Sequence, residues 1–384
     1  MDFELSDDHS ALVDSVRDFA ARVVAPQIGD LYERGAFPYE IVRGMGAMGL
    51  FGLPFPVEHG GMGGDSFALY LAIEELARVD SSVAITLEAA VSLGAMPLYR
   101  FGSAELKAQW LPSLCSGEAL GAFGLTEAGG GSDAGATRTT AVVDGDAWVI
   151  NGSKAFITNS GTDITSFVIV TAVTGQAADG RKEISAILVP SGTPGFTVEP
   201  SYSKVGWRSS DTHGLSFSDC RVPLGNLVGE RGRGYAQFLE ILDEGRIAIS
   251  ALSVGLAQGC VDESVRYAGE RHAFGRPIGT NQAVQFLIAD MEVRAHMSRI
   301  AWREAASRMS RGEPFKREAS IAKLYSSEAA MENARWATQV HGGYGFMLDS
   351  AVGRFYRDAK VLEIGEGTSE VQRMLIAREL GLPS

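Results

Sequence analysis

The spacing of apolar residues changes twice along the chain, and this change limits most strongly what the chain can fold into. Over the first third, apolar residues recur at helical spacing, as Leu12, Val16 and Phe19 do. After Gly117, short apolar runs separated by Gly, Pro and Asp take over, which is the pattern of strands. Helical spacing returns after Arg231 and continues to the end. Such segregated blocks predict separate units rather than β-α-β alternation.

The length of 384 residues also exceeds what one hydrophobic core usually holds. We therefore predict a multidomain α+β chain with three units. They are an N-terminal α-helical domain over residues 1–120, a middle antiparallel β-domain over residues 121–231 and a C-terminal α-helical bundle over residues 232–384.

Two local signals predict where elements end. Pro26 should end the first helix, because proline cannot continue a helix interior. The pair Asn151-Gly152 stands between the apolar residues 148–150 and the run 154–158, and Asn-Gly favours a tight turn with positive φ. We therefore expect two strands joined by a two-residue turn at this point.

Charge and cysteine content exclude several classes of protein. The net charge of -13 argues against a nucleic-acid binder, which needs a basic surface. The three cysteines, Cys115, Cys220 and Cys260, are scattered, so we expect neither disulfides nor a zinc or other metal site. The longest uncharged stretches, such as Ile247–Val261, look too short for a membrane span, and the acidic N-terminus does not resemble a signal peptide. We expect a cytoplasmic protein.

One glycine pattern matches a dinucleotide-binding motif by its spacing alone. Gly44, Gly46 and Gly49 match the dinucleotide-binding pattern G-x-G-x-x-G. That motif requires a preceding strand and a following helix, whereas residues 39–43 favour a helix and Pro54 and Pro56 follow closely. We interpret these glycines as a helix end and a tight loop.

Four other segments carry groups suited to a cofactor, although each has a plain structural reading. The loop from Leu125 to Asp133 contains three consecutive glycines, which can cradle a phosphate or form a surface turn. Phe156 and Thr158 should face one side of a strand, where they could back a flat cofactor or fill a core. Arg271 at a helix end could anchor a diphosphate or be a surface charge. The segment from Gln339 to Phe346 has paired glycines that permit close backbone approach.

A fifth segment holds a candidate catalytic carboxylate. Ser369 and Gln372 resemble a capping box, so a helix should begin here, with Val371 and Met374 on its apolar face. Glu366 then lies between two glycines just before that helix. A carboxylate in this place can point into a cavity, or it can be an anion that the helix dipole stabilises.

Taken together and in this order, the segments resemble the acyl-CoA dehydrogenase family along essentially the whole chain. The resemblance rests on Leu125-Thr126-Glu127 to Asp133, Ile157-Thr158-Asn159, Arg271 to Phe274 and Glu366-Gly367-Thr368. It implies an N-terminal helical domain, a middle β-domain and a C-terminal four-helix bundle, usually in a homotetramer. It also implies FAD as the cofactor, an acyl-CoA as the substrate and an electron-transfer flavoprotein as the electron acceptor.

The resemblance also implies roles for individual residues. Positions lining the isoalloxazine ring are matched by Phe123, Leu125, Thr126, Gly131 and Ser132, with Phe156 and Thr158 on the other flank. Positions holding the FAD diphosphate and adenosine, partly from a neighbouring subunit, are matched by Arg271, Phe274, Gln282, Gln339 and Gly343, and the remaining contacts by Thr368 and Glu370. Substrate positions are matched by Asp243 and Arg246 at the CoA portion and by Ser132 and Gly367.

The chemistry that the resemblance implies begins at Glu366, which removes the α-proton of the thioester. The backbone N–H of the base and a flavin hydroxyl stabilise the thioester oxygen, and the β-hydrogen leaves as hydride, giving a trans-2-enoyl-CoA. The chain departs from many members at Gly365, where they have Tyr, and at Phe156, where they have Trp. The missing bulk at Gly365 predicts tolerance of branched acyl groups. Some members carry the base on an earlier helix, at the position of Gly245.

Two alternatives stay open at this stage. One is an acyl-CoA oxidase or a related flavin monooxygenase, although the chain lacks the extra C-terminal domain of large oxidases. The other is a non-catalytic subunit that binds acyl-CoA or flavin. Such a subunit should have lost Glu366 or Arg271, and both are present.

Overall fold

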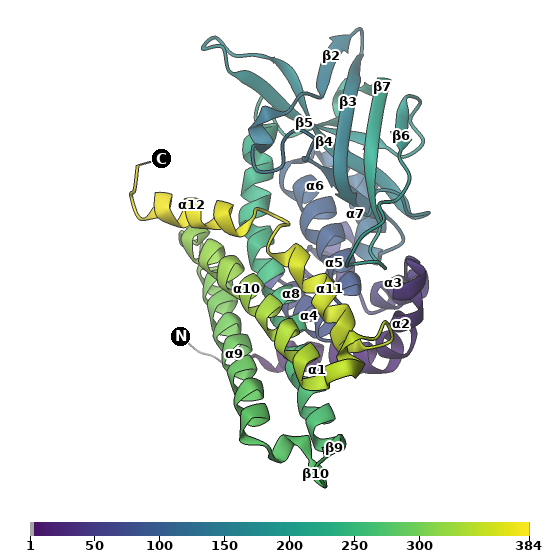
Figure 1. Ribbon diagram of the computed structural model, residues 1–384. Helices are drawn as coiled ribbons and strands as arrows, with labels where there is room; N and C mark the ends of the chain where they lie inside the picture. Colours follow the sequence, from purple (N-terminus) through teal and green to yellow (C-terminus); the bar gives the residue numbers. More distant parts are fainter. Residues whose placement is uncertain (1–3, 384) are drawn as a thin grey trace.

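The structure, a computed structural model, describes residues 4–383 and shows helices, then strands, then helices along the chain (Figure 1). The expected order of helical, β and helical units is therefore confirmed. The sheet lies at one end of the molecule, and the C-terminal helices run away from it (Figure 1).

The N-terminal unit consists of helices that share one large buried apolar cluster with the C-terminal helices. Its elements are α1 (Asp7–Phe19), the π-helical η1 (Ala20–Val24), α2 (Ala25–Arg34), α3 (Tyr39–Ala47), the 3-10 turns η2 (Leu50–Gly52) and η3 (Val57–His59), α4 (Ser66–Ala77), α5 (Ser81–Glu88), the π-helical η4 (Ala89–Ala95), α6 (Met96–Phe101) and α7 (Ala104–Ser116). Gly44, Gly46 and Gly49 fall in and just after α3, and residues 4–43 contain no strand before them, so the rejection of a dinucleotide motif is confirmed.

The prediction that Pro26 ends the first helix is wrong. The chain continues from α1 through η1 into α2, and Pro26 lies in the first turn of α2. Proline is tolerated there because its missing N–H is one that a first turn does not need. The π-helical segment before it supplies the local change in hydrogen bonding.

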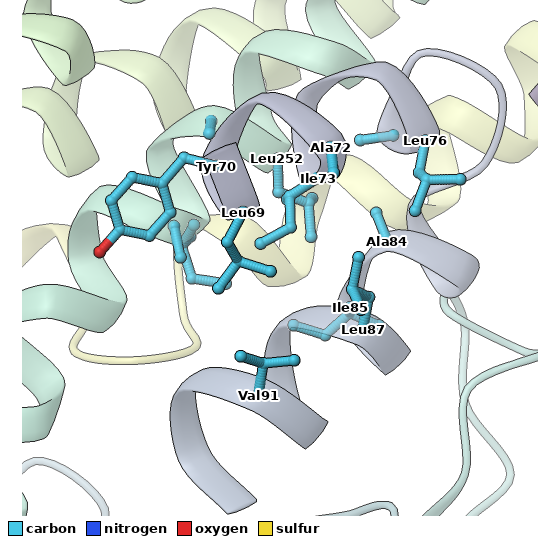
Figure 2. Close-up of a cluster of buried hydrophobic side chains, with 14 of the residues drawn as sticks. Leu69, Tyr70, Ala72, Ile73, Leu76, Ala84, Ile85, Leu87, Val91 and Leu252 are labelled. Carbon is cyan, nitrogen blue, oxygen red and sulfur yellow. The ribbon is translucent and has the colours of Figure 1, made fainter. Parts of the chain in front are cut away.

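One buried helical stretch is longer and more apolar than the sequence analysis expected of any segment. Within the described residues, Ser81–Phe101 is long and apolar enough to cross a membrane by length and composition alone. However, 94% of its most apolar window is buried inside the protein. Figure 2 shows why: Ala84, Ile85, Leu87 and Val91 of this stretch face Leu69 and Ile73 of α4, with Leu252 from a later helix beside them.

The middle unit is one twisted sheet. Its elements are β1 (Leu120–Gly124), the 3-10 turn η5 (Ala134–Ala136), β2 (Thr140–Asp144), β3 (Ala147–Thr158), β4 (Thr165–Gln176), β5 (Lys182–Pro190), β6 (Phe196–Val198), β7 (Thr212–Pro223), the 3-10 turn η6 (Leu224–Asn226) and β8 (Leu227–Val228). The strand order is β6-β7-β3-β2-β4-β5-β8, with β1 paired to β4. Most pairs are antiparallel, but β1 and β2 run parallel to β4.

The predicted turn at Asn151-Gly152 is also wrong. Both residues lie inside the single strand β3, where the register against β7 shifts between Ile150 and Gly152. A Cβ on Gly152 would come within 2.6 Å of the Thr139 hydroxyl, so glycine is needed for close approach rather than for a turn. The real turn comes earlier, between β2 and β3.

The C-terminal unit is built around one long helix. Its elements are α8 (Gly234–Glu270), the short strands β9 (His272–Ala273) and β10 (Arg276–Pro277), the 3-10 turn η7 (Ile278–Thr280), α9 (Gln282–Ser310), α10 (Lys316–His341), the 3-10 segment η8 (Gly342–Phe346), α11 (Ala351–Leu362) and α12 (Ser369–Glu379). Helix α8 begins against β5 and ends at the β9–β10 hairpin, at the far end of the molecule (Figure 1).

A buried polar cluster ties α11 to the other two units. Asp358 accepts hydrogen bonds from the backbone N–H of Trp207 at 2.7 Å and from the Ser81 hydroxyl at 2.6 Å. Arg354 donates to Asp80 at 2.9 Å, and both side chains are buried. Because α11 leads directly into the Glu366 loop, this cluster fixes the loop's position relative to α5.

Candidate active site

Glu366 lies in the loop between α11 and α12 with an uncommon backbone conformation. Its φ is +51°, and that of Gly367 is +92°. A φ of this size strains any residue with a side chain, so glycine is favoured at Gly367, where a Cβ would also lie 2.8 Å from Nε2 of Gln372. Two consecutive left-handed residues turn the chain sharply, and a non-glycine residue in this region is typical of a functional site.

The helix after the loop begins at the expected place with a different cap. Thr368, not Ser369, is the N-cap of α12, and its hydroxyl accepts a hydrogen bond from the N–H of Val371 at 3.3 Å. Gln372 does not reach back to the cap but donates to backbone carbonyls of the loop. Met374, on the expected apolar face, is 64% exposed in the single chain.

The Glu366 carboxyl points into the protein towards α8. Its Oε2 atom is buried and has no hydrogen-bond partner among the described residues. A Cβ built on Gly245 would lie 2.4 Å from this atom. The carboxyl therefore occupies the space that a side chain at residue 245 would need. Glu244 points elsewhere and pairs with Arg100.

A second carboxyl, which the sequence analysis missed, adjoins the first. Glu88 ends α5 directly before the π-helical η4, its side chain is fully buried, and both of its oxygens lack partners within residues 4–383. Burial raises the pKa of Glu88 well above its usual range, and the charge of Glu366 adds to the effect. A glutamate inside an apolar run, as in Thr86-Leu87-Glu88-Ala89-Ala90, is the signal that could have revealed it.

The surrounding charges decide which carboxyl is ionised. Burial raises the pKa of Glu366 to about 7, against the opposing effect of the cationic Lys323 and Arg246. Neither cation acts appreciably on Glu88, so Glu88 keeps its proton more strongly. Two buried carboxylates in contact cannot both ionise easily. Near neutral pH the pair therefore holds one proton on Glu88, and Glu366 is the carboxyl that loses its proton more readily.

Unpartnered polar atoms gather around the two carboxyls. Besides the carboxyl oxygens, the Arg246 Nε and the Gln372 Oε1 are buried without a partner in the described part of the chain. Most buried polar groups in proteins are hydrogen-bonded, so such a cluster needs an explanation, and a polar ligand is one. Arg246 also pairs with Asp243, which Lys316 approaches at 3.3 Å.

The residues expected at a flavin ring gather on one side of the sheet. The carbonyl of Thr126 accepts a hydrogen bond from the Ala155 N–H at 2.9 Å, which brings the start of the glycine loop beside Phe156 on β3. Phe156 is 65% exposed with φ +61°, and Thr158 follows it, half-buried. The register shift between Lys154 and Ile157 turns the Phe156 ring outwards.

Other residues predicted to line the flavin ring are either packed in the core or exposed on the glycine loop. Leu125 is buried, and Phe123 stacks on Phe238 of α8 with ring centroids 3.8 Å apart, so both also serve the core. Gly131 and Ser132 are exposed on the loop. Lys154, at the start of the predicted run 154–158, has a role that the sequence analysis missed: its buried ammonium group donates to Glu127 at 2.9 Å and anchors this loop.

The residues expected at a diphosphate lie at the other end of α8. Arg271 and Gly343 line a concavity of about 490 Å³, together with Tyr267 and His341, whose rings stack with centroids 4.3 Å apart. The stacked pair was not foreseen. Phe274 is fully exposed on the hairpin, and Gln282 and Gln339 are also exposed, outside the concavity. Glu370, predicted among the remaining contacts, is exposed in the first turn of α12.

The two predicted cofactor groups are therefore far apart in one chain. Helix α8 has 37 residues, which makes it about 55 Å long. The sheet adjoins its first turn and Arg271 follows its last (Figure 1). The structure does not bring the Arg271 group to the Phe156 group within a single copy.

Comparisons with known proteins now add to this geometry. Three family models match the chain in order: acyl-CoA dehydrogenase N-terminal domain over residues 6–118, middle domain over 122–220 and C-terminal domain over 232–381. The chain belongs to the acyl-CoA dehydrogenase family. Members of this family are FAD-dependent flavoproteins that oxidise a CH–CH bond.

Individual members of the acyl-CoA dehydrogenase family match over nearly the whole chain. A probable acyl-CoA dehydrogenase YngJ of Bacillus subtilis is 48% identical over 99% of this chain and all of that protein. The mitochondrial short-chain specific acyl-CoA dehydrogenase of Rattus norvegicus is 41% identical over 98% of this chain and 91% of its own length. The solved butyryl-CoA dehydrogenase of Megasphaera elsdenii superposes with a TM-score of 0.94 at 38% identity, covering 99% of this chain and 100% of that one.

The residues present in this acyl-CoA dehydrogenase family member fit FAD. The outward Phe156 ring beside two threonines offers an aromatic surface with hydroxyls for a flat ring system. The concavity at Arg271 offers a guanidinium group beside exposed backbone. A Cβ on Gly343 would meet nothing within 4 Å, so no contact in this chain requires that glycine and the space is open to a ligand.

Proposed function

We propose that this chain dehydrogenates a short- or branched-chain acyl-CoA to the trans-2-enoyl-CoA, with FAD as cofactor and Glu366 as the base. One observation carries the proposal. In a chain of this family, the Oε2 atom of Glu366 is buried, and its carboxyl, with a pKa of about 7, lies beside two cations and a protonated neighbour. A general base works best when its pKa is close to the working pH.

The protein's own groups account for the proton-transfer step. Oε2 of Glu366 takes the α-proton, and burial removes the water that would otherwise stabilise the carboxylate. Glu88 keeps a proton, so it adds no second negative charge while the enolate forms. The backbone N–H of Glu366 is our candidate donor to the thioester oxygen. FAD, when bound, supplies the acceptor for the β-hydride.

We assign the remaining predicted residues as follows. The ring is held by Phe123, Leu125, Thr126, Gly131, Ser132, Phe156 and Thr158, with Thr368 and Glu370 near the base. The diphosphate and adenosine are held by Arg271, Phe274, Gln282, Gln339 and Gly343. CoA and thioester are held by Asp243, Arg246, Ser132 and Gly367. The domain bounds 1–120, 121–231 and 232–384 belong to the same proposal.

The separation of the two cofactor groups supports a homotetramer. Since Arg271 lies at the far end of α8, we infer that it serves the FAD of a neighbouring copy. Phe274, fully exposed in the single chain, would then be covered by that copy. We further propose an electron-transfer flavoprotein as the acceptor and a cytoplasmic role in fatty-acid β-oxidation, as the family resemblance implies.

Replacing Arg271 by Met should weaken FAD retention. Charged hydrogen bonds are worth about 1.5–3 kcal/mol, so we expect binding about 10- to 100-fold weaker. The measurement is flavin absorbance per chain after gel filtration in dilute buffer. Arg335→Met, on an exposed arginine of α10 that pairs with Glu332, is the matched control. Full flavin content in the Arg271 variant would rule out this role.

The substrate proposal rests on the space at Gly365. A Cβ there would meet only the Val361 carbonyl, at 3.5 Å, so a larger side chain could be accommodated and its absence leaves room. We expect acyl-CoA esters with short straight or branched chains to bleach the flavin anaerobically. Gly365→Tyr should keep straight-chain activity and reduce branched-chain kcat/KM by about tenfold, the scale of one or two methylene contacts. Strict straight-chain preference in the unmodified protein would contradict this specificity.

A further inference from the structure

One buried lysine beside the base also contacts the backbone of the loop that carries Glu366. Lys323 lies on α10 with its side chain fully buried. Its ammonium group donates a hydrogen bond to the backbone carbonyl of Gly367 at 2.7 Å. A lysine is seldom fully buried, because moving its charge out of water is costly unless it is paired.

Gln372 holds the same loop from the other side. Its side-chain amide, also fully buried, donates to the carbonyl of Gly367 at 3.0 Å and to that of Glu366 at 3.3 Å. The two carbonyls thus belong to the two residues with positive φ. A left-handed non-glycine residue is strained and persists only where its surroundings fix it. Lys323 and Gln372 fix this conformation through their hydrogen bonds to the two carbonyls.

We propose that Lys323 is a positioning residue for the base: its ammonium group fixes the Glu366–Gly367 backbone and keeps the Glu366 carboxyl ionised. This inference rests on the proposed function of Glu366. Gln372 also fixes the Glu366–Gly367 backbone. Because its side chain is neutral, it does not help to keep the Glu366 carboxyl ionised. The loop carries both the carboxyl and the backbone N–H of Glu366, so a shift of the loop displaces both.

The titratable and charged groups around Glu366 explain how Lys323 keeps the Glu366 carboxyl ionised. From α5 it faces Glu88, from α4 Tyr70, from α8 Arg246 and from α10 Lys323. Burial raises the pKa of Glu366 to about 7, and Lys323 is the strongest opposing influence. Burial also lowers the pKa of Lys323 to about 8, which leaves it cationic at neutral pH. Without this cation, Glu366 should bind its proton more tightly.

Lys323→Met removes the ammonium group while keeping an unbranched side chain. We expect kcat to fall by about 100-fold, the scale of a displacement of about 1 Å in an active site. We also expect the midpoint of the acidic limb of the kcat/KM profile to rise by about one pH unit. Lys360→Met makes the same change on an exposed lysine of α11 and should alter neither value. Gln372→Leu should lower kcat and leave the midpoint in place.

A titration without substrate separates this inference from the proposed function. The carboxylic-acid C=O infrared band that Glu366→Gln removes reports protonation of Glu366 in the holoenzyme. In Lys323→Met its midpoint should also rise by about one unit. If Lys323→Met does not fold, Lys323→Gln, which also removes the charge, is titrated instead. An unmoved band midpoint, or wild-type kcat in the folded variant, would overturn the inference; a wild-type protein without acyl-CoA activity would instead refute the proposed function.

Discussion

Glu366→Gln should lower kcat by at least about 1,000-fold, the upper part of the range for a general base, while the yellow flavin stays bound. The amide has nearly the shape of the carboxyl but cannot accept the α-proton. Glu88 is unsuited to replace it, because no cation offsets its burial and it remains protonated near neutral pH. The measurement is steady-state turnover with butyryl-CoA and an artificial electron acceptor, with flavin content determined on the same sample.

The matched control is Glu40→Gln on α3. Glu40 pairs with Arg43 at 2.7 Å at the protein surface, so this variant should keep wild-type kcat. Turnover retained in Glu366→Gln would refute the assignment of the base. A loss of flavin in Glu366→Gln would mean that the residue holds the cofactor site together rather than acting in catalysis.

Moving the base to α8 should restore activity that its removal abolishes. In Glu366→Gly the carboxyl is gone, and kcat should fall as far as in Glu366→Gln. Adding Gly245→Glu should recover at least about 100-fold of that loss, since a restored general base is worth about 100- to 10,000-fold. The reason is geometric, because a Cβ at residue 245 lies 2.4 Å from the present position of Glu366 Oε2.

The short distance between a Cβ at residue 245 and Glu366 Oε2 also predicts that a side chain at residue 245 lowers activity when Glu366 is present. Gly245→Ala with Glu366 in place should disturb the carboxyl and reduce kcat, whereas Gly245→Ala in Glu366→Gly should have no further effect. This double-mutant cycle measures the coupling between the two positions. Additive effects of the two substitutions would show that they do not share one space.

The sequence allowed the α, β, α order to be predicted because spacing over long segments reports which face each element buries. Local signals were less reliable. Asn151-Gly152 predicted a turn, yet close approach of Thr139 uses the glycine inside a strand. Pro26 predicted a helix end, yet a π-helical segment accommodates it. In both cases a contact or a backbone irregularity that leaves no sequence pattern decided the outcome.

The residues of the candidate site also divide into those that could be selected from the sequence and those that could not. Glu366 could be selected from its glycine-flanked loop and the family resemblance. Glu88 and Lys323 could not, because they come from α5 and α10 and meet the base only in three dimensions. Their residue types inside buried helical faces were the available signal, and a charged residue in such a face also occurs in structural ion pairs such as Arg354–Asp80.

The central claim, that Glu366 initiates oxidation of an acyl-CoA through its buried Oε2 atom, is tested most directly by a single anaerobic turnover. Purified wild-type protein and Glu366→Gln are mixed with butyryl-CoA, and the visible flavin absorbance is followed in time. The account predicts that wild type bleaches and yields the trans-2-enoyl-CoA, while Glu366→Gln binds the ester without bleaching. Equal bleaching of both proteins, or no bleaching of the flavin-loaded wild type by any short straight or branched acyl-CoA, would contradict it.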